Sequence, residues 1–211
     1  MLAVLVLTPA PSRAGTDPGA DAWTGRIIFE NDVLWVDDSD RHYSNGIRLE
    51  AQGPDGRYWS WLEGPARWLT ASVPDDPLRM GWALGQNIYT PEDIKTTELV
   101  EDDRPYAGWL HGDLTMSARR DRTLTMATLS LGVVGPAAMG EEVQRWFHEV
   151  IDSPIPQGWD NQLDNEPALL LVTQRAWGDV VPPRPAPLLG NVGLDWDFVP
   201  HGDLALGNVF T

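Results

Sequence analysis

Residues 188–199 read LLGNVGLDWDFV, and apolar and polar side chains alternate along most of this stretch. Successive side chains of a β-strand point to opposite faces, so the stretch predicts a strand with one apolar and one acidic face. The apolar face would carry Leu188, Val192, Leu194, Trp196 and Phe198. The opposite face would carry Asn191, Asp195 and Asp197.

The same period of two recurs through most of the chain after residue 22. It is present in residues 23–35, 43–52, 78–89, 106–118, 122–134 and 167–177, and a further strand begins near Leu204. Residues 118–121 indicate a hairpin turn, and residues 182–187 indicate a proline-rich turn. The sequence therefore predicts one all-β, antiparallel domain over residues 23–211, with about eight strands.

Residues 140–152 break the alternation and predict an amphipathic helix, which is the one substantial helix expected in the domain. Its apolar stripe consists of Val143, Phe147, Val150 and Ile151. Its polar side carries Gln144, Arg145, His148 and Asp152. Because residues three and four apart project to the same side of a helix, His148 is expected to share its surroundings with Gln144 and Arg145.

The composition limits the classes of partner. The chain has 31 acidic and 15 basic side chains and a formal net charge of -16, which argues against DNA or RNA as partner and favours divalent cations. It has no cysteine, which excludes disulfides and thiolate metal sites. The alternation by itself leaves two architectures open: a membrane β-barrel with a polar interior, and a soluble secreted sandwich with one wet face.

The N-terminus resembles an export signal. Residues 2–7 form a short apolar run, and Ser12-Arg13-Ala14 places small residues at the two positions that a signal peptidase reads. Residues 1–14 are therefore expected to be a signal peptide that is cleaved after Ala14. No Lys or Arg precedes the apolar run, so the signal is expected to be incomplete at its start. An apolar N-terminus without a targeting role is the alternative.

Oxygen-bearing side chains cluster after the first predicted strand. Asn31 and Asp32 lie at its end, and residues 37–41 (DDSDR) and 43–46 (YSNG) follow closely. Hard cations such as Ca²⁺ bind several carboxylate, amide and backbone oxygens, so this stretch is a candidate calcium site. Its spacing does not match an EF-hand loop, and an acidic solvated loop is the alternative.

His148 is the candidate general base. Of the four histidines, at positions 42, 111, 148 and 201, only His148 falls on the predicted helix with polar neighbours. An imidazole with a near-neutral pKa suits proton abstraction, although a purely structural histidine is the alternative. The sequence lacks a Gly-x-Ser-x-Gly elbow, a His-Glu-x-x-His pair and a phosphate loop, which removes the common serine hydrolase, zinc protease and nucleotide-binding classes.

Arg104 is a third candidate. It lies in residues 102–109, DDRPYAGW, next to a proline and a glycine that shape the entry of a predicted strand. Its guanidinium suits bidentate binding of a carboxylate or phosphate, and an ordinary structural ion pair is the alternative.

Several segments, taken together and in order, resemble the LpxR-type lipid A 3'-O-deacylases. These are residues 30–32 (END), 40–46 (DRHYSNG), 85–91 (GQNIYTP), 103–109 (DRPYAGW), 131–136 (LGVVGP), 140–144 (GEEVQ), His148 and 158–163 (GWDNQL). Each segment is weak alone, but their common order over more than half of the chain is specific. The resemblance covers nearly everything from residue 23 onward.

This resemblance implies a twelve-stranded antiparallel β-barrel in the outer membrane, with the active site between the barrel wall and a short helix near the outer leaflet. It also implies Ca²⁺-dependent removal of the 3'-linked acyloxyacyl chain of lipid A. Carried over by position, His148 would activate water, Asn31 and Asp32 would hold the metal, and Ser44 would bind the ester or its oxyanion.

The barrel also assigns the faces of the strand over residues 188–199: Leu194, Trp196 and Phe198 would face lipid, and Asp195 and Asp197 would face inward. Family members continue for several strands more, so the chain is expected to be C-terminally truncated and not to close a barrel alone. The functional alternatives are a non-catalytic outer-membrane barrel with a structural or lipopolysaccharide-binding role, and a soluble secreted binding protein.

Overall fold

The computed structural model describes residues 22–31, 45–178, 181–186 and 194–209. For residues 31, 45, 181–186 and 194–198 the description covers the backbone alone. The expected signal peptide, Asp32 and Ser44 lie outside the described residues.

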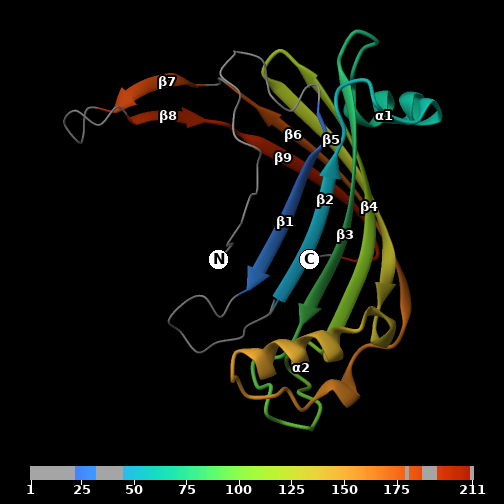
Figure 1. Cartoon of the computed structure of the whole chain (residues 1–211), viewed down its shortest axis with the longest axis vertical. Helices are drawn as coiled ribbons and strands as arrows, with labels where there is room; N and C mark the ends of the chain where they lie inside the picture. Colours follow the sequence, from blue (N-terminus) through green and yellow to red (C-terminus); the bar gives the residue numbers. More distant parts are fainter. Residues whose placement is uncertain (1–21, 32–44, 179–180, 187–193, 210–211) are drawn as a thin grey trace.

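Nine strands are described, all paired antiparallel. They are β1 (Thr24–Asn31), β2 (Asn45–Gln52), β3 (Leu78–Tyr89), β4 (Ala107–Arg120), β5 (Thr123–Val134), β6 (Glu166–Trp177), β7 (Val181–Ala186), β8 (Leu194–Phe198) and β9 (His201–Gly207). Seven form one strongly curved sheet in the order β1-β2-β3-β4-β5-β6-β9, and β7 pairs with β8 (Figure 1). The predicted all-β, antiparallel class is confirmed, and the bounds of β3 match the prediction to the residue.

β7 corrects one sequence-based expectation, because residues 182–187 were expected to form a proline-rich turn. Val181–Ala186 instead form a strand that pairs with β8, with a register shift between Val181 and Arg184. A proline cannot donate a backbone hydrogen bond, and a strand with a single described partner tolerates that loss. Of the strand expected over residues 188–199, the structure describes Leu194–Phe198, and the faces of its side chains lie outside the description.

The register sorts the main sheet into an apolar and a polar face. Leu49 pairs with Leu84, Leu84 with Gly112, Gly112 with Leu131 and Leu131 with Leu169, so four exposed leucines form one row across five strands. The neighbouring row, on the other face, consists of Arg48, Gly85, His111, Gly132 and Ala168. An apolar outer face and a polar inner face are the alternation of a membrane barrel.

Within the described residues, two α-helices accompany the sheet, at opposite ends of its strands (Figure 1). α2 (Gly140–Val150) confirms the predicted helix. α1 (Glu63–Thr70) corrects the expectation of a single substantial helix. Its signal was the spacing of Leu62, Ala66 and Thr70, which are buried at every fourth residue. Among the described residues, no helix is both long and apolar enough to cross a membrane.

The two ends of the sheet differ in their connections. At the α2 end, the strands are joined by residues 32–44, 90–106 and 135–165. At the α1 end, β4 and β5 are joined by two residues, Asp121 and Arg122, and Asp121 adopts a left-handed conformation with φ of 51°. Residues 53–77, which contain α1, join β2 and β3 at the same end, and β6 is joined to β9 there through β7 and β8. All three connections at the α2 end are loops longer than the β4–β5 turn, and binding and catalytic groups concentrate in such loops.

Candidate active site

α2 buries two members of its predicted polar side, while Arg145 and Asp152 of that side are exposed. Of its predicted apolar stripe, Val150 and Ile151 are exposed, and Val143 and Phe147 are partly buried. Gln144 and His148 are buried, one turn apart. Trp146 and Val150 are 62% and 64% exposed. A helix of a soluble protein usually buries its apolar stripe and exposes its polar one. The burial of Gln144 and His148 beside the exposed Trp146 and Val150 fits a helix that lies between a polar site and an apolar medium.

The ring of His148 is held in one orientation by a backbone carbonyl. Its Nδ1 lies 2.6 Å from the carbonyl oxygen of Pro154. A carbonyl oxygen accepts but does not donate, so Nδ1 carries the proton and Nε2 of the neutral ring keeps its lone pair. Nε2 has no hydrogen-bond partner among the described residues. The geometry thus presents Nε2 as the proton acceptor.

The end of α2 explains how Pro154 reaches this ring. Asp152 adopts a left-handed conformation with φ of 55°, and Ser153 donates its backbone N–H to the carbonyl of His148 at 2.9 Å. This six-to-one hydrogen bond is characteristic of a Schellman motif, which turns the chain back against the last helical turn. The turn therefore stacks Pro154 beside His148.

Gln144 is fixed by the 3-10 helix η3 (Trp159–Asn161). Its Oε1 accepts a hydrogen bond from Nε1 of Trp159 at 3.0 Å, and the Trp159 ring packs on Tyr106 with centroids 4.9 Å apart. Its Nε2 is buried without a hydrogen-bond partner among the described residues. Leaving a buried donor unpaired costs about 1–3 kcal/mol, so a buried, oriented amide N–H beside His148 is a candidate to donate to a ligand oxygen.

Of the two calcium ligands expected from the sequence, Asn31 lies within the described residues, with its backbone alone. Asn31 ends β1, where it pairs with Asn45, and Asn45 pairs with Ile88 of β3. Two strand spacings amount to about 10 Å, which separates the backbones of Asn31 and Ile88. Ile88 in turn belongs to a buried cluster against which Val143 of α2 packs. The register thus brings the end of β1 to the α2 end of the sheet, although the side chains of Asn31, Asp32 and Ser44 lie outside the description.

Arg104 contacts Tyr89 of β3 and its own neighbour Asp103. Its guanidinium carbon is 5.7 Å from the ring centroid of Tyr89, a cation–π distance, and its backbone N–H is bound by Asp103 Oδ1 at 2.7 Å. These contacts place Arg104 at the entry to β4, and its binding of a carboxylate or phosphate stays a prediction beside the alternative of a structural ion pair.

A buried charged network that the sequence did not reveal lies on the inner face of the sheet. His111 donates Nδ1–H to Asp113 Oδ1 at 2.8 Å, its Nε2 lies 3.0 Å from Asn87 Oδ1, and Arg48 pairs with the second oxygen of Asp113. Arg48 also binds Glu50 at 2.7 Å. The available signal was the spacing of His111 and Asp113 on one face of β4. The network ties β2, β3 and β4 together at the centre of the sheet.

Known proteins were compared with this chain by sequence and by structure. The family model described as "Outer membrane protein LpxR" matches residues 1–211. A comparison with curated proteins found no match. The solved structure of LpxR from Salmonella typhimurium superposes with a TM-score of 0.60 at 21% identity, over 82% of this chain and 50% of that one. The chain thus spans about half the length of that protein.

The family match extends over the whole chain, and the structural match shows the same fold. Both agree with the apolar outer and polar inner faces of the sheet, and they exclude the soluble sandwich that the alternation had left open. The chain belongs to the LpxR family and is a β-barrel protein of the outer membrane.

Proposed function

We propose that this chain carries the catalytic base and metal ligands of a Ca²⁺-dependent esterase that removes the 3'-linked acyloxyacyl chain of lipid A. The observation that carries the proposal is the His148 ring, whose Nδ1–H is bound to Pro154 and whose Nε2 is left as an acceptor. A structural histidine would gain from hydrogen bonds at both nitrogens. A general base needs one nitrogen fixed and the other available.

In the proposed reaction, Nε2 of His148 takes a proton from water while the water oxygen forms a bond to the ester carbonyl carbon. The bond from that carbon to the sugar oxygen then breaks. The proton passes from the imidazolium to the departing sugar oxygen, which leaves a free 3'-hydroxyl and a free acyloxyacyl acid. Nδ1–H stays bound to Pro154 throughout, so the ring keeps its orientation while it gains and loses charge.

Asn31 and Asp32 are the proposed metal ligands, and Ser44 is the proposed contact to the ester or its oxyanion. An amide and a carboxylate oxygen suit the preference of Ca²⁺ for hard oxygen ligands. When bound, the ion would polarise the ester carbonyl and favour negative charge on its oxygen. The buried Nε2 of Gln144 is the chain's own donor for the same oxygen.

The exposed side of α2 suits a substrate that remains in the membrane. Met139, Trp146 and Val150 are all exposed beside the buried Gln144 and His148. An acyl chain lying against these side chains would keep its apolar contacts while the ester enters the polar side. This division fits lipid A, whose sugar headgroup lies at the surface and whose acyl chains lie within the bilayer.

Mass spectrometry of lipid A tests the activity directly. The protein is produced in the outer membrane of a Gram-negative host that lacks such a deacylase, and lipid A is extracted. Loss of the mass of one acyloxyacyl chain at the 3' position is the expected result. Unmodified lipid A in cells with folded, heat-modifiable protein would favour the non-catalytic barrel.

Replacing Asp32 with alanine is expected to weaken Ca²⁺ binding, because the site loses its one charged ligand among the proposed residues. Raised calcium should therefore restore part of the turnover. The measurement is deacylation against calcium concentration in detergent micelles. Asp75→Ala is the matched control, since Asp75 is an exposed carboxylate in the connection at the α1 end. Equal calcium curves for the two variants would remove Asp32 from the metal site.

A further inference from the structure

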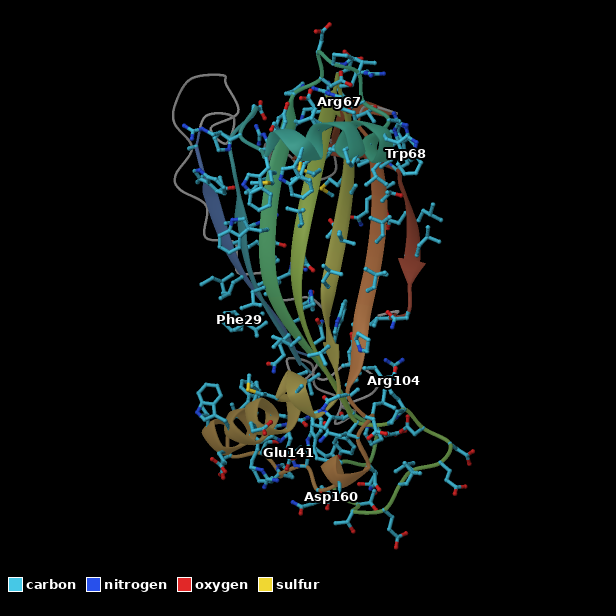
Figure 2. All side chains as sticks on the ribbon, turned by 90° about the vertical axis from the view of Figure 1, so that its right-hand side faces the viewer. Phe29, Arg67, Trp68, Arg104, Glu141 and Asp160 are labelled. Atoms are coloured by element: carbon cyan, nitrogen blue, oxygen red, sulfur yellow. The ribbon has the colours of Figure 1, made fainter. Side chains whose placement is uncertain are left out.

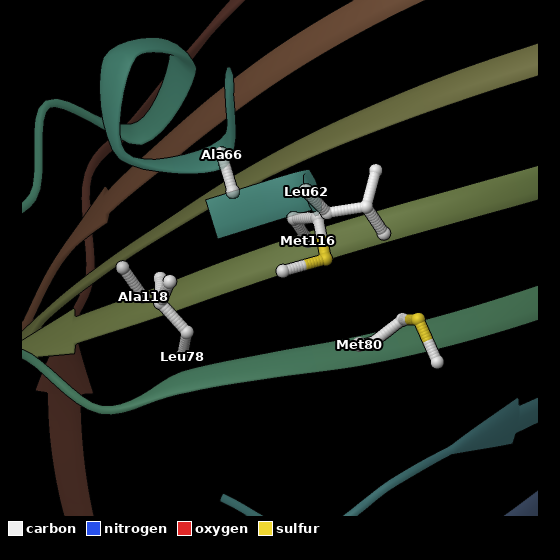
Figure 3. Close-up of a cluster of buried hydrophobic side chains, with 6 residues drawn as sticks. All are labelled: Leu62, Ala66, Leu78, Met80, Met116 and Ala118. Carbon is white, nitrogen blue, oxygen red and sulfur yellow. The ribbon is translucent and has the colours of Figure 1, made fainter. Parts of the chain in front are cut away.

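α1 lies on the lipid-facing side of the sheet. Leu62 and Ala66 pack on Leu78, Met80 and Met116, in a cluster that also includes Ala118 (Figure 3). Met80 and Leu84 are four residues apart on β3, so they share a face, and Leu84 belongs to the exposed leucine row. The helix therefore covers the end of the apolar outer face and leaves the polar inner face open.

The opposite side of this helical segment carries three tryptophans, here called the tryptophan patch: Trp59, Trp61 and Trp68. They are 55%, 67% and 81% exposed, and the rings of Trp59 and Trp61 stack with centroids 6.0 Å apart. Their indole N–H groups have no hydrogen-bond partner among the described residues. Such a patch is unusual on a surface that faces only water.

The orientation of α1 matches that of a helix at a bilayer surface. Figure 2 shows α1 lying across the strands rather than along them, with Trp68 near one end of the helix. Strands of an outer-membrane barrel run through the bilayer, so a helix across them lies close to the membrane plane. Indole rings concentrate at the membrane–water interface, where the ring is buried and the N–H remains solvated or bound to headgroups.

The loops indicate which surface this is. Outer-membrane barrels have short turns on the periplasmic side and longer loops on the extracellular side. The two-residue β4–β5 turn lies at the α1 end, which also holds residues 53–77 with α1 and the connection from β6 to β9 through β7 and β8. The connections at the α2 end, over residues 32–44, 90–106 and 135–165, include no turn as short as the β4–β5 turn. α1 is accordingly at the periplasmic leaflet, which consists of phospholipid.

We propose that α1 is an interfacial anchor whose tryptophan patch seats in the headgroup layer of the periplasmic phospholipid leaflet. Lipid is the expected contact because the apolar surface is continuous: two residues beyond Met80, on the same face of β3, Trp82 is exposed within the apolar band. The tryptophan patch thus continues the apolar outer surface of the barrel to the end of its strands. This inference rests on the outer-membrane location and is independent of the hydrolase proposal.

The absence of cysteine from the chain allows a single label at each position. Trp68→Cys, Trp82→Cys and Asp75→Cys would each carry an environment-sensitive fluorophore in the protein refolded into phosphatidylcholine–phosphatidylethanolamine vesicles. Asp75 lies exposed in the same connection as α1 and is the matched aqueous control, and Trp82 is the membrane-core control. Heat-modifiable mobility on gels establishes that each variant is folded.

The label at residue 68 is expected to be quenched most by lipids that carry a spin label near the headgroup, whereas the label at residue 82 responds most to a spin label deep in the acyl chain. Iodide in the water should quench residue 68 several-fold less than residue 75. Equal iodide quenching at 68 and 75 would overturn the proposal. Shielding from iodide without quenching by either lipid would also overturn it, because it would indicate a protein contact at the patch.

Discussion

Replacing His148 with alanine is expected to lower deacylation by about 10²–10⁴-fold, because a positioned general base typically contributes that much. The effect should fall on turnover, since the lost proton transfer belongs to the transition state. Raised calcium should recover none of it, in contrast to Asp32→Ala. The measurement is the initial rate of acyl release from purified lipid A in detergent micelles.

His148→Asn separates positioning from proton transfer. An asparagine amide can still donate to the carbonyl of Pro154, as Nδ1 of His148 does at 2.6 Å, but it offers no basic nitrogen. We expect it to be as inactive as the alanine variant while it preserves the turn after α2. His201→Ala is the control, because His201 is exposed on β9. Full activity in His148→Asn would contradict the assignment of His148 as base.

Asp113→Ala is expected to destabilise the barrel by about 1–3 kcal/mol, because it leaves Nδ1–H of the buried His111 without its acceptor, whereas Arg48 keeps Glu50 as a partner. Its side chain is fully buried and binds both His111 and Arg48. The measurement is the urea midpoint of the protein in lipid vesicles, followed by gel mobility. Asp203→Ala removes an exposed carboxylate on β9 and should change stability by less than about 0.5 kcal/mol. Similar midpoints for the two variants would show that the network does not stabilise the sheet.

The strands were predictable because alternation is a local property. Each segment with a period of two has an apolar and a polar face in any sheet, and the bounds of β3 followed from that pattern alone. α2 was predictable for the same reason, since its period of 3.6 contrasts with the flanking strands. The sequence did not predict α1 and β7, because the local pattern of each combines features of different structures. α1 has eight residues with apolar side chains on both sides, and β7 has prolines in a strand.

The same distinction between local pattern and tertiary packing applies to the candidate site. The sequence identified His148 from its residue type and its helix, because both are read within a few residues. It could not show that Pro154 fixes the ring or that Gln144 and His148 are buried, since these depend on a turn and on packing against Trp159. The Arg48, Asn87, His111 and Asp113 network was equally out of reach, because strand register brings together residues up to 65 positions apart.

The sequence by itself determined the antiparallel all-β class, most strand positions, the helix of the site and, through its ordered segments, the family. Those features depend on side-chain periodicity and on residue identity, which the chain carries locally. Only the tertiary structure decided that α1 covers the outer face, that α2 exposes Trp146 while it buries Gln144, and that His148 keeps Nε2 available. The physical reason is that burial and hydrogen-bond partners are set by strand register and packing, which join residues distant in sequence.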